Sequence, residues 1–108
     1  MTIKLAAPKN EIVYINNGGW GGAYINEDDA ARINKFERKL PYGWRDKFKY
    51  WVEVLGGLAP DAGVYTVAVT DDLETAAAIY KEWQVAAPTM VAVIDSEDYG
   101  QVEPYGYG

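Results

Sequence analysis

The sequence has 108 residues, of which 49% are hydrophobic and 24% charged, and it contains neither cysteine nor histidine. This composition is typical of a single globular domain that is large enough to bury a core. The missing residue types exclude disulfides, thiolate chemistry, and the commonest general base and metal ligand, so any catalysis would depend on carboxylates, hydroxyls or lysines. No apolar run approaches the length of a membrane span, and we expect a cytoplasmic protein.

Charge is distributed unevenly along the chain. Residues 1–58 contain nine Lys or Arg and seven Asp or Glu, whereas residues 59–108 contain one Lys and nine Asp or Glu. The two halves therefore carry net charges of +2 and −8, which together give the −6 of the whole chain. Such an asymmetry between halves indicates charged partners.

The beginning of the chain predicts a β-hairpin followed by a helix. Residues 11–15 form an apolar run typical of a strand, residues 16–19 (Asn-Asn-Gly-Gly) favour a tight turn, and residues 20–25 would return as a second strand. The glycines lack the spacing of a phosphate-binding loop. Asn26 is a good N-cap for the helix that follows. The apolar positions of this helix are Ala30, Ile33, Phe36 and Leu40.

Residues 41–43 (Pro-Tyr-Gly) end that helix, and a second amphipathic helix is predicted over residues 44–55. Its apolar residues recur at intervals of four, three and four, which places them on one helical face. They are Trp44, Phe48, Trp51 and Leu55. Two glycines at 56–57 would terminate the helix. Because Tyr, Trp and Val suit strands, a strand over residues 50–55 stays as the alternative.

The next stretch predicts a strand, a capped helix and a second strand. Residues 64–69 and 90–94 are uncharged runs rich in β-branched side chains, as buried strands are. Between them, Asp71 precedes Glu74 by three residues, which is the spacing of an acidic capping box at the start of a helix. A helix of this length can connect two parallel strands.

These elements predict the fold class and the domain organisation. We expect an α/β (or α+β) domain over residues 1–98, with a small three- to four-stranded sheet covered by about three helices. The expected order is β(hairpin)-α-α-β-α-β. Residues 99–108 alternate Tyr and Gly, which predicts either a flexible C-terminal tail or an edge segment packed through its tyrosines.

Acidic residues gather after both of the late predicted strands. If these strands are parallel, their C-terminal ends lie on one edge of the sheet, where open α/β sheets bind ligands. We expect a partner protein to bind at this edge, through Asp71, Asp72, Glu74, Asp95, Glu97, Asp98 and Tyr99. One alternative is that Asp71, Asp72 and Asp95 hold Mg²⁺ in a small enzyme or a phospho-acceptor domain. Another is that Asp71 caps a helix and the other acidic residues are solvated residues of turns.

Basic residues interleaved with aromatics form a second candidate surface. They lie on the two helices predicted within residues 27–55, and they are Arg32, Lys35, Arg38, Lys39, Arg45, Lys47 and Lys49. Basic side chains can neutralise phosphates while aromatic side chains stack on bases, so this pattern predicts a nucleic-acid-binding subunit as an alternative function. The acidic balance of the whole chain makes direct binding of nucleic acid the less favoured hypothesis.

The order of the predicted elements resembles the barstar family of small intracellular ribonuclease inhibitors. The resemblance covers roughly residues 11–95: a Leu-Pro-Tyr-Gly break at 40–43, a tryptophan-bearing helix over 44–55, and a strand-helix-strand end over 64–95. It implies a non-enzymatic inhibitor. The acidic binding helix of that family would correspond to residues 44–55, which here carry Arg45, Lys47 and Lys49 and only two acidic residues, Asp46 and Glu53, so no binding residue is carried over.

The function predicted from all these patterns is a small acidic protein-binding module without enzymatic activity, cofactor or metal. Its partner would be a basic protein that handles nucleic acids, because opposite fields speed encounter and specify the partner. Tyr and Trp, present nine and four times, are favoured anchors of such interfaces. Inhibitors of the immunity type, and phage or mobile-element anti-defence proteins such as anti-CRISPR or DNA-mimic proteins, belong to this class. A phage-encoded protein would act in the host-cell cytoplasm.

Overall fold

The computed structural model describes residues 10–14, 27–56, 63–86 and 91–107. Within them the chain forms three helices and a mixed α/β arrangement with a four-stranded sheet, so the predicted fold class is confirmed. The elements in chain order are β1 (Glu11–Val13), α1 (Glu27–Arg38), α2 (Trp44–Lys47), β2 (Tyr50–Gly56), β3 (Gly63–Thr70), α3 (Leu73–Ala86) and β4 (Val91–Asp95). The turn and second strand of the predicted N-terminal hairpin lie outside the described residues.

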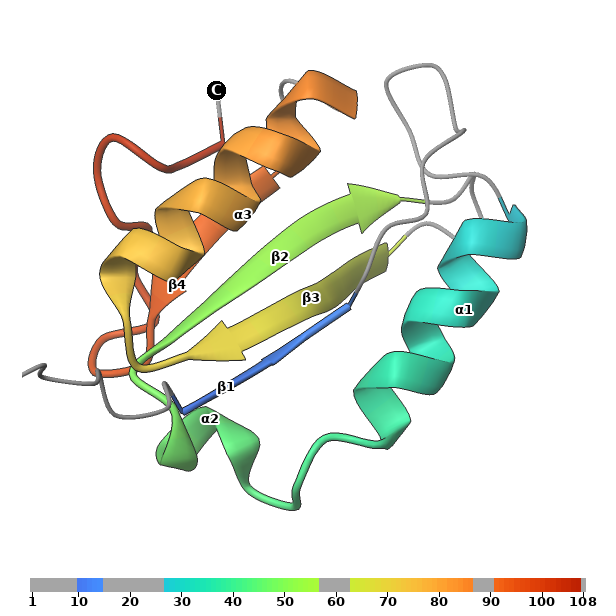
Figure 1. Ribbon diagram of the computed structural model, residues 1–108, viewed down its shortest axis with the longest axis horizontal. Helices are drawn as coiled ribbons and strands as arrows, with labels where there is room; N and C mark the ends of the chain where they lie inside the picture. The colour runs from blue at the N-terminus through green and yellow to red at the C-terminus, as the bar shows by residue number, and fades with distance from the viewer. Residues whose placement is uncertain (1–9, 15–26, 57–62, 87–90, 108) are drawn as a thin grey trace, which may run out of the picture.

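The strands are arranged in the order β1-β3-β2-β4, and every neighbouring pair is antiparallel (Figure 1). Because β3 and β4 both run antiparallel to β2, they run parallel to each other with β2 between them. The α3 helix therefore joins two parallel strands that are not neighbours. Adjacent strands lie about 4.8 Å apart, so the ends of β3 and β4 are separated by roughly twice that distance.

The helix predicted over residues 44–55 is wrong beyond its first turn. The helix α2 ends at Lys47, Phe48 has an extended backbone, and β2 follows from Tyr50. The spacing of Trp44, Phe48 and Trp51 suits a helix, but Tyr, Trp and Val also fit a pleated sheet, and β2 gains backbone hydrogen bonds from both neighbouring strands. The alternative of a strand over 50–55 is the correct one.

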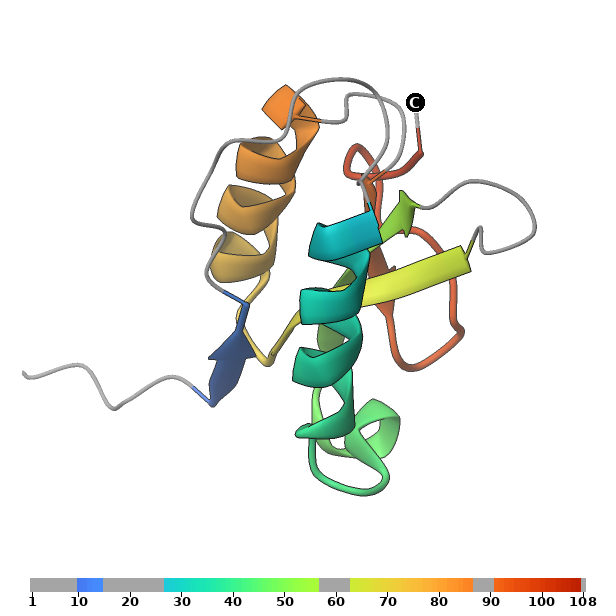
Figure 2. The same ribbon diagram turned by 90° about the vertical axis from the view of Figure 1, so that its right-hand side faces the viewer.

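Two apolar clusters cover the two faces of the sheet. On the face that carries α3, Trp83 and Ala76 pack against Val52, Val54 and β4. On the opposite face, the buried side chains of the cluster come from the sheet and from the segments around α2; they are Leu40, Phe48, Trp51, Val69, Ala92 and Ile94. Figure 2 shows α3 on one side of the sheet, and α1 runs alongside the sheet. The chain thus builds a core on each side of β2.

Residues 99–107 pack along the outer edge of β4. Of the two expectations for this segment, the structure therefore agrees with an edge segment packed through its tyrosines and not with a flexible tail. The amide of Val93 donates a hydrogen bond to the Tyr105 carbonyl at 2.7 Å, and the Val102 amide donates to the Val93 carbonyl at 2.9 Å. Tyr105 packs with the cluster on the α3 side, while Tyr107 packs with the cluster on the other side. The segment thus covers the edge of β4 and contributes to both faces.

Candidate protein-binding face around helix α3

Four carboxylates of the predicted acidic edge accept hydrogen bonds from backbone amides, and one of them is Asp98, which accepts from the Gly100 amide at 2.8 Å. Asp71 accepts hydrogen bonds from the backbone amide of Lys49 and the side-chain amide of Asn10, each at 2.9 Å. Asp95 accepts one from the amide of Glu97 at 2.9 Å. Asp72 accepts two from Thr75, through the amide at 2.9 Å and the hydroxyl at 2.7 Å. The contacts of Asp95 and Asp98 close a turn, those of Asp72 cap α3, and those of Asp71 connect segments that are distant in sequence.

The helix cap lies one residue later than the sequence predicts. Asp72 is the residue that caps α3, since its carboxylate binds the third residue of the helix, Thr75, and its carbonyl accepts from Ala76 at 3.1 Å. The pair Asp71 and Glu74 has the spacing of a capping box, but Asp71 instead joins the end of β3 to the start of β2. An Asp with a β-region backbone directly before the first helical residue is the usual cap.

The acidic residues after β3 and β4 do not form one cluster. The first residues of β2 lie between them, because Tyr50 pairs with Thr70 on one side and with Asp95 on the other. Within the described ranges no three Asp or Glu side chains are grouped as a metal site requires. The Asp71, Asp72 and Asp95 carboxylates are thus divided between two separate turns. Of the predicted set, Asp72 and Asp95 are partly buried, and the exposed members are Asp71, Glu74, Glu97, Asp98 and Tyr99.

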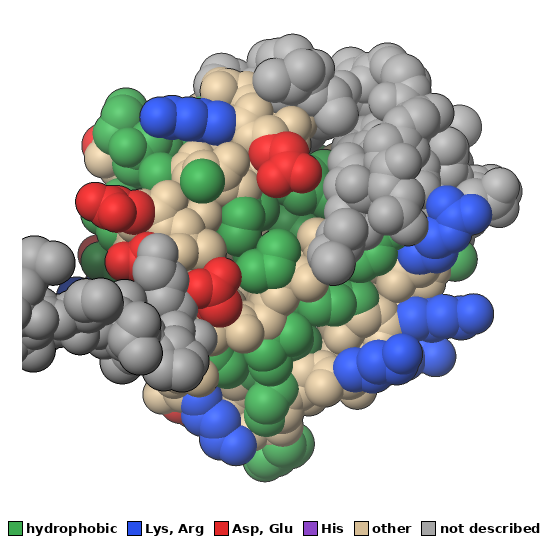
Figure 3. All heavy atoms as spheres, viewed as in Figure 1, with side chains coloured by type: hydrophobic (Ala, Val, Ile, Leu, Met, Phe, Trp, Pro, Cys, Tyr) green, Lys and Arg blue, Asp and Glu red, His purple; other side chains and the backbone are tan. Residues whose placement is uncertain are grey.

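The predicted basic residues all lie on the surface. They are exposed at Arg32, Lys35, Arg38, Lys39, Arg45, Lys47 and Lys49. Arg45 stacks on an indole, with its guanidinium carbon 4.3 Å from the ring centroid of Trp44. Tyr42 is 98% exposed in the same region. In Figure 3 most of the visible Lys and Arg side chains lie along α1, whereas Asp and Glu side chains gather around α3.

A half-buried pair of carboxylates on the face opposite α3 was missed by the sequence analysis. Glu53 accepts hydrogen bonds from the Trp51 indole at 2.9 Å and from the Tyr107 hydroxyl at 2.6 Å. Glu37 accepts one from the Thr66 amide, at the part of the β3 edge that β1 does not cover. The sequence offered one indication of this pair, because Glu53 is an acidic residue in the middle of the apolar run 50–55. These contacts pair the carboxylates with donors inside the fold.

Burial raises the pKa of two groups here, the Glu37 carboxyl and the Tyr107 phenol. Removal from water raises the pKa of Glu37 above its ordinary value of 4.5, opposed by the Thr66 amide and by the charge of Arg45. The charge of Glu53 raises it further. The pKa of Tyr107 is raised as well, by burial and by its hydrogen bond to Glu53, because both favour the neutral phenol.

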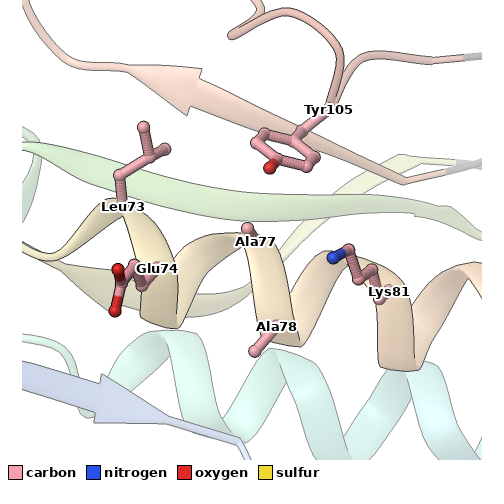
Figure 4. A pocket seen from close by; sticks show the side chains of 6 residues that line it. All are labelled: Leu73, Glu74, Ala77, Ala78, Lys81 and Tyr105. Atoms are coloured by element: carbon pink, nitrogen blue, oxygen red, sulfur yellow. The ribbon is translucent and has the colours of Figure 1, made fainter.

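A pocket of about 390 Å³ lies between α3 and the C-terminal segment. Its walls are Leu73, Glu74, Ala77, Ala78, Lys81 and Tyr105. Figure 4 shows the Tyr105 ring across from Ala77, with Leu73 toward one end of the pocket and Lys81 toward the other. The Tyr105 ring is held by an edge-to-face contact with Tyr80, at 5.5 Å between centroids. We call this feature the α3 pocket.

A second hollow of about 530 Å³ lies on the β1 side of the same helix. Its walls are Glu11, Val13, Glu74, Thr75, Ala78 and Ile79. The two hollows share Glu74 and Ala78, which therefore form a ridge between them. The sequence analysis did not find the α3 pocket, because its far wall, Tyr105, comes from a segment that has no apolar periodicity.

Comparisons of the chain with protein-family models, with curated proteins and with solved structures gave no match. No helix within the described ranges is long and apolar enough to cross a membrane.

Proposed function

We propose that this domain is a non-enzymatic binding protein that docks the acidic surface around α3 onto a basic partner protein, as inhibitors and immunity proteins of nucleic-acid-handling enzymes do. The observation that carries the proposal is the segregation of exposed charge in the folded domain. The exposed acidic side chains of α3 and of the segment after it are Glu74, Glu82, Glu97, Asp98 and Glu103. A basic partner would be attracted to this side and repelled by the α1 side.

The turn after β4 supplies an aromatic anchor that is adjacent in sequence to Glu97 and Asp98 and lies on the face of the sheet opposite α3. Tyr99 is 61% exposed, and its ring packs against the buried Trp51 ring at 5.6 Å between centroids. Its backbone has a φ of 56°, which is uncommon for a residue with a side chain. A large aromatic side chain that is already supported by a neighbour loses little freedom on binding, as interface anchors do.

Affinity capture with matched charge variants tests this proposal. The acidic-side variant carries Glu82→Lys, Glu97→Lys and Glu103→Lys, and the basic-side variant carries Lys35→Glu, Arg38→Glu and Lys47→Glu. All six positions are exposed, so both variants should fold. We expect the unchanged domain and the basic-side variant to retain one basic protein from a native extract at low salt, and the acidic-side variant to lose it. Recovery of nucleic acid without a protein partner, or loss with the basic-side variant alone, would contradict the proposal.

The exposure of Tyr42 among basic residues favours one second candidate function, which is binding of single-stranded nucleic acid by the α1–α2 side. Arg45 stacked on Trp44 and the nearby Tyr42 would present flat groups to bases, while α1 supplies cations for phosphates. Fluorescence anisotropy with a labelled single-stranded oligonucleotide distinguishes the two functions. Binding that the Tyr42→Ala change abolishes would support this candidate.

A further inference from the structure

We infer that the α3 pocket is the socket of the proposed interface, and that it takes an apolar side chain which a partner presents next to a Lys or Arg. This inference rests on the proposed function and adds to it the chemistry of the docking segment. Protein interfaces concentrate their binding energy where an apolar group enters a pocket that a polar rim surrounds. The α3 pocket offers both parts.

The apolar part of the pocket is formed by small side chains and one aromatic ring. Ala77 and Ala78 leave space on α3, Leu73 is 36% exposed, and the Tyr105 ring closes the opposite side. Tyr105 is fixed in place, since it packs on Tyr80 and its carbonyl accepts the Val93 amide. The pocket is therefore formed before a partner arrives, and a preformed pocket lowers the entropic cost of binding.

The charges on the rim fix the chemistry and the direction of the occupant. Glu74 lines both hollows beside α3. The second hollow, on the β1 side, has one further acidic residue in its wall, Glu11. Lys81, two turns further along the helix, lines the α3 pocket at its other end. A cation of the partner is thus attracted toward Glu74 and repelled from Lys81, so the apolar side chain and the neighbouring Lys or Arg can enter in one orientation only.

Two synthetic peptides serve as probes of this socket: acetyl-Lys-Lys-Leu-Lys-Lys-amide and the same peptide with Ser in place of Leu. Two-dimensional NMR of the ¹⁵N-labelled domain follows each titration at low salt. We expect the Leu peptide to shift the amide signals of Ala77, Ala78 and Tyr105 and to bind more tightly than the Ser peptide. Equal affinity of the two peptides, or shifts that avoid these residues, would overturn the inference.

Three single variants at exposed positions on α3 distinguish binding in the socket from a general attraction of the cationic peptide to the acidic surface. Glu74→Lys and Glu82→Lys change the net charge equally, but only Glu74 lines the pocket. We expect Glu74→Lys to weaken binding of the Leu peptide by about two- to tenfold more than Glu82→Lys does, and Lys81→Glu to strengthen it. Melting temperatures of the variants check that each one folds.

The outcomes distinguish failure of the socket from failure of the proposed function. If both peptides bind equally and Glu74→Lys weakens binding no more than Glu82→Lys, the acidic surface attracts cations without a socket, and the inference fails while the proposed function stands. If neither peptide binds and the acidic-side variant captures the same proteins as the unchanged domain, both fail.

Discussion

The carboxylates of Asp72 and Glu37 each accept a hydrogen bond from a backbone amide. Asp72 binds the first turn of α3, and Glu37 binds the Thr66 amide at the edge of β3. Every buried side-chain polar atom within the described residues has a hydrogen-bond partner. At the residue scale the acidic character of this chain therefore has two parts, one used within the fold and one exposed to a partner.

Asp72→Ala is expected to lower the free energy of unfolding by about 1 kcal/mol, because the amide and hydroxyl of Thr75 lose their acceptor. Urea denaturation monitored by circular dichroism measures the change. Asp72→Asn is the matched control, since Asn also caps helices and should preserve most of the stability. An Ala variant as stable as the unchanged domain would show that this cap contributes nothing.

Glu37 makes the stability of the domain depend on pH. Folding raises the pKa of its carboxyl above 4.5, chiefly through burial, so the folded state binds this proton more tightly than the unfolded state. Its contribution to stability is fully present below pH 4.5 and is lost as the pH rises through the folded-state pKa. Glu37→Gln removes this titration but keeps an oxygen that can accept the Thr66 amide.

We therefore expect the free energy of unfolding of the unchanged domain, minus that of Glu37→Gln, to decrease as the pH rises from below 4.5 toward neutrality. Urea denaturation of both proteins at a series of pH values tests this. A difference that is independent of pH, or that increases with pH, would contradict the assignment of burial as the dominant influence.

At the element scale, the segment after β4 acts as the outer border of the sheet. It supplies Tyr107 to one face and Tyr105 to the other, and the Tyr80 hydroxyl donates to the Gly106 carbonyl at 3.0 Å. Edges of sheets expose unpaired backbone groups that invite other strands, and covering such an edge prevents this. The segment thereby protects β4 and builds the α3 pocket.

Tyr107→Phe tests how much one contact of this segment contributes. The change removes the hydroxyl that donates to Glu53 at 2.6 Å, and a hydrogen bond to a charged group contributes about 1.5–3 kcal/mol. We expect a loss of stability in that range by urea denaturation. Tyr42→Phe, at a position that is 98% exposed, is the control and should change stability little. Equal effects of the two substitutions would show that the hydrogen bond between Tyr107 and Glu53 does not stabilise the domain.

Much of the fold could be predicted from local pattern, because α1, β3, α3 and β4 have clear periodicity or uniform apolar character. The segment 44–55 could not, since its aromatic spacing satisfies a helix and its residue types satisfy a strand, and only pairing with two neighbours decides between them. The grouping of the acidic residues could not be predicted for a related reason. The position of β2 separates Asp71 from Asp95, and strand order has no signature in local sequence.

On the scale of the whole molecule, the face seen in Figure 3 separates most Lys and Arg side chains along α1 from Asp and Glu side chains around α3, although the net charge is −6. We expect the intact domain to bind heparin resin through the α1 side at a low salt concentration of about 0.1 M, because screening then acts over about 10 Å and leaves each side to act locally. Lys35→Glu with Arg38→Glu should abolish retention, whereas Glu82→Lys with Glu103→Lys should not. Failure of the unchanged domain to bind at low salt would show that the net charge dominates.

The strand order also carries a consequence for the kinetics of folding. β2 and β3 follow each other in the chain and pair along their length, whereas β1 and β4 join this central hairpin from distant positions. Contacts that close short loops form first, since long loops cost more entropy. We expect Val54→Ala in β2 to slow folding, and Val93→Ala in β4 mainly to speed unfolding, when stopped-flow rates are measured against denaturant. The reverse pattern would place the rate-limiting step at the outer edge of the sheet, where the C-terminal segment docks.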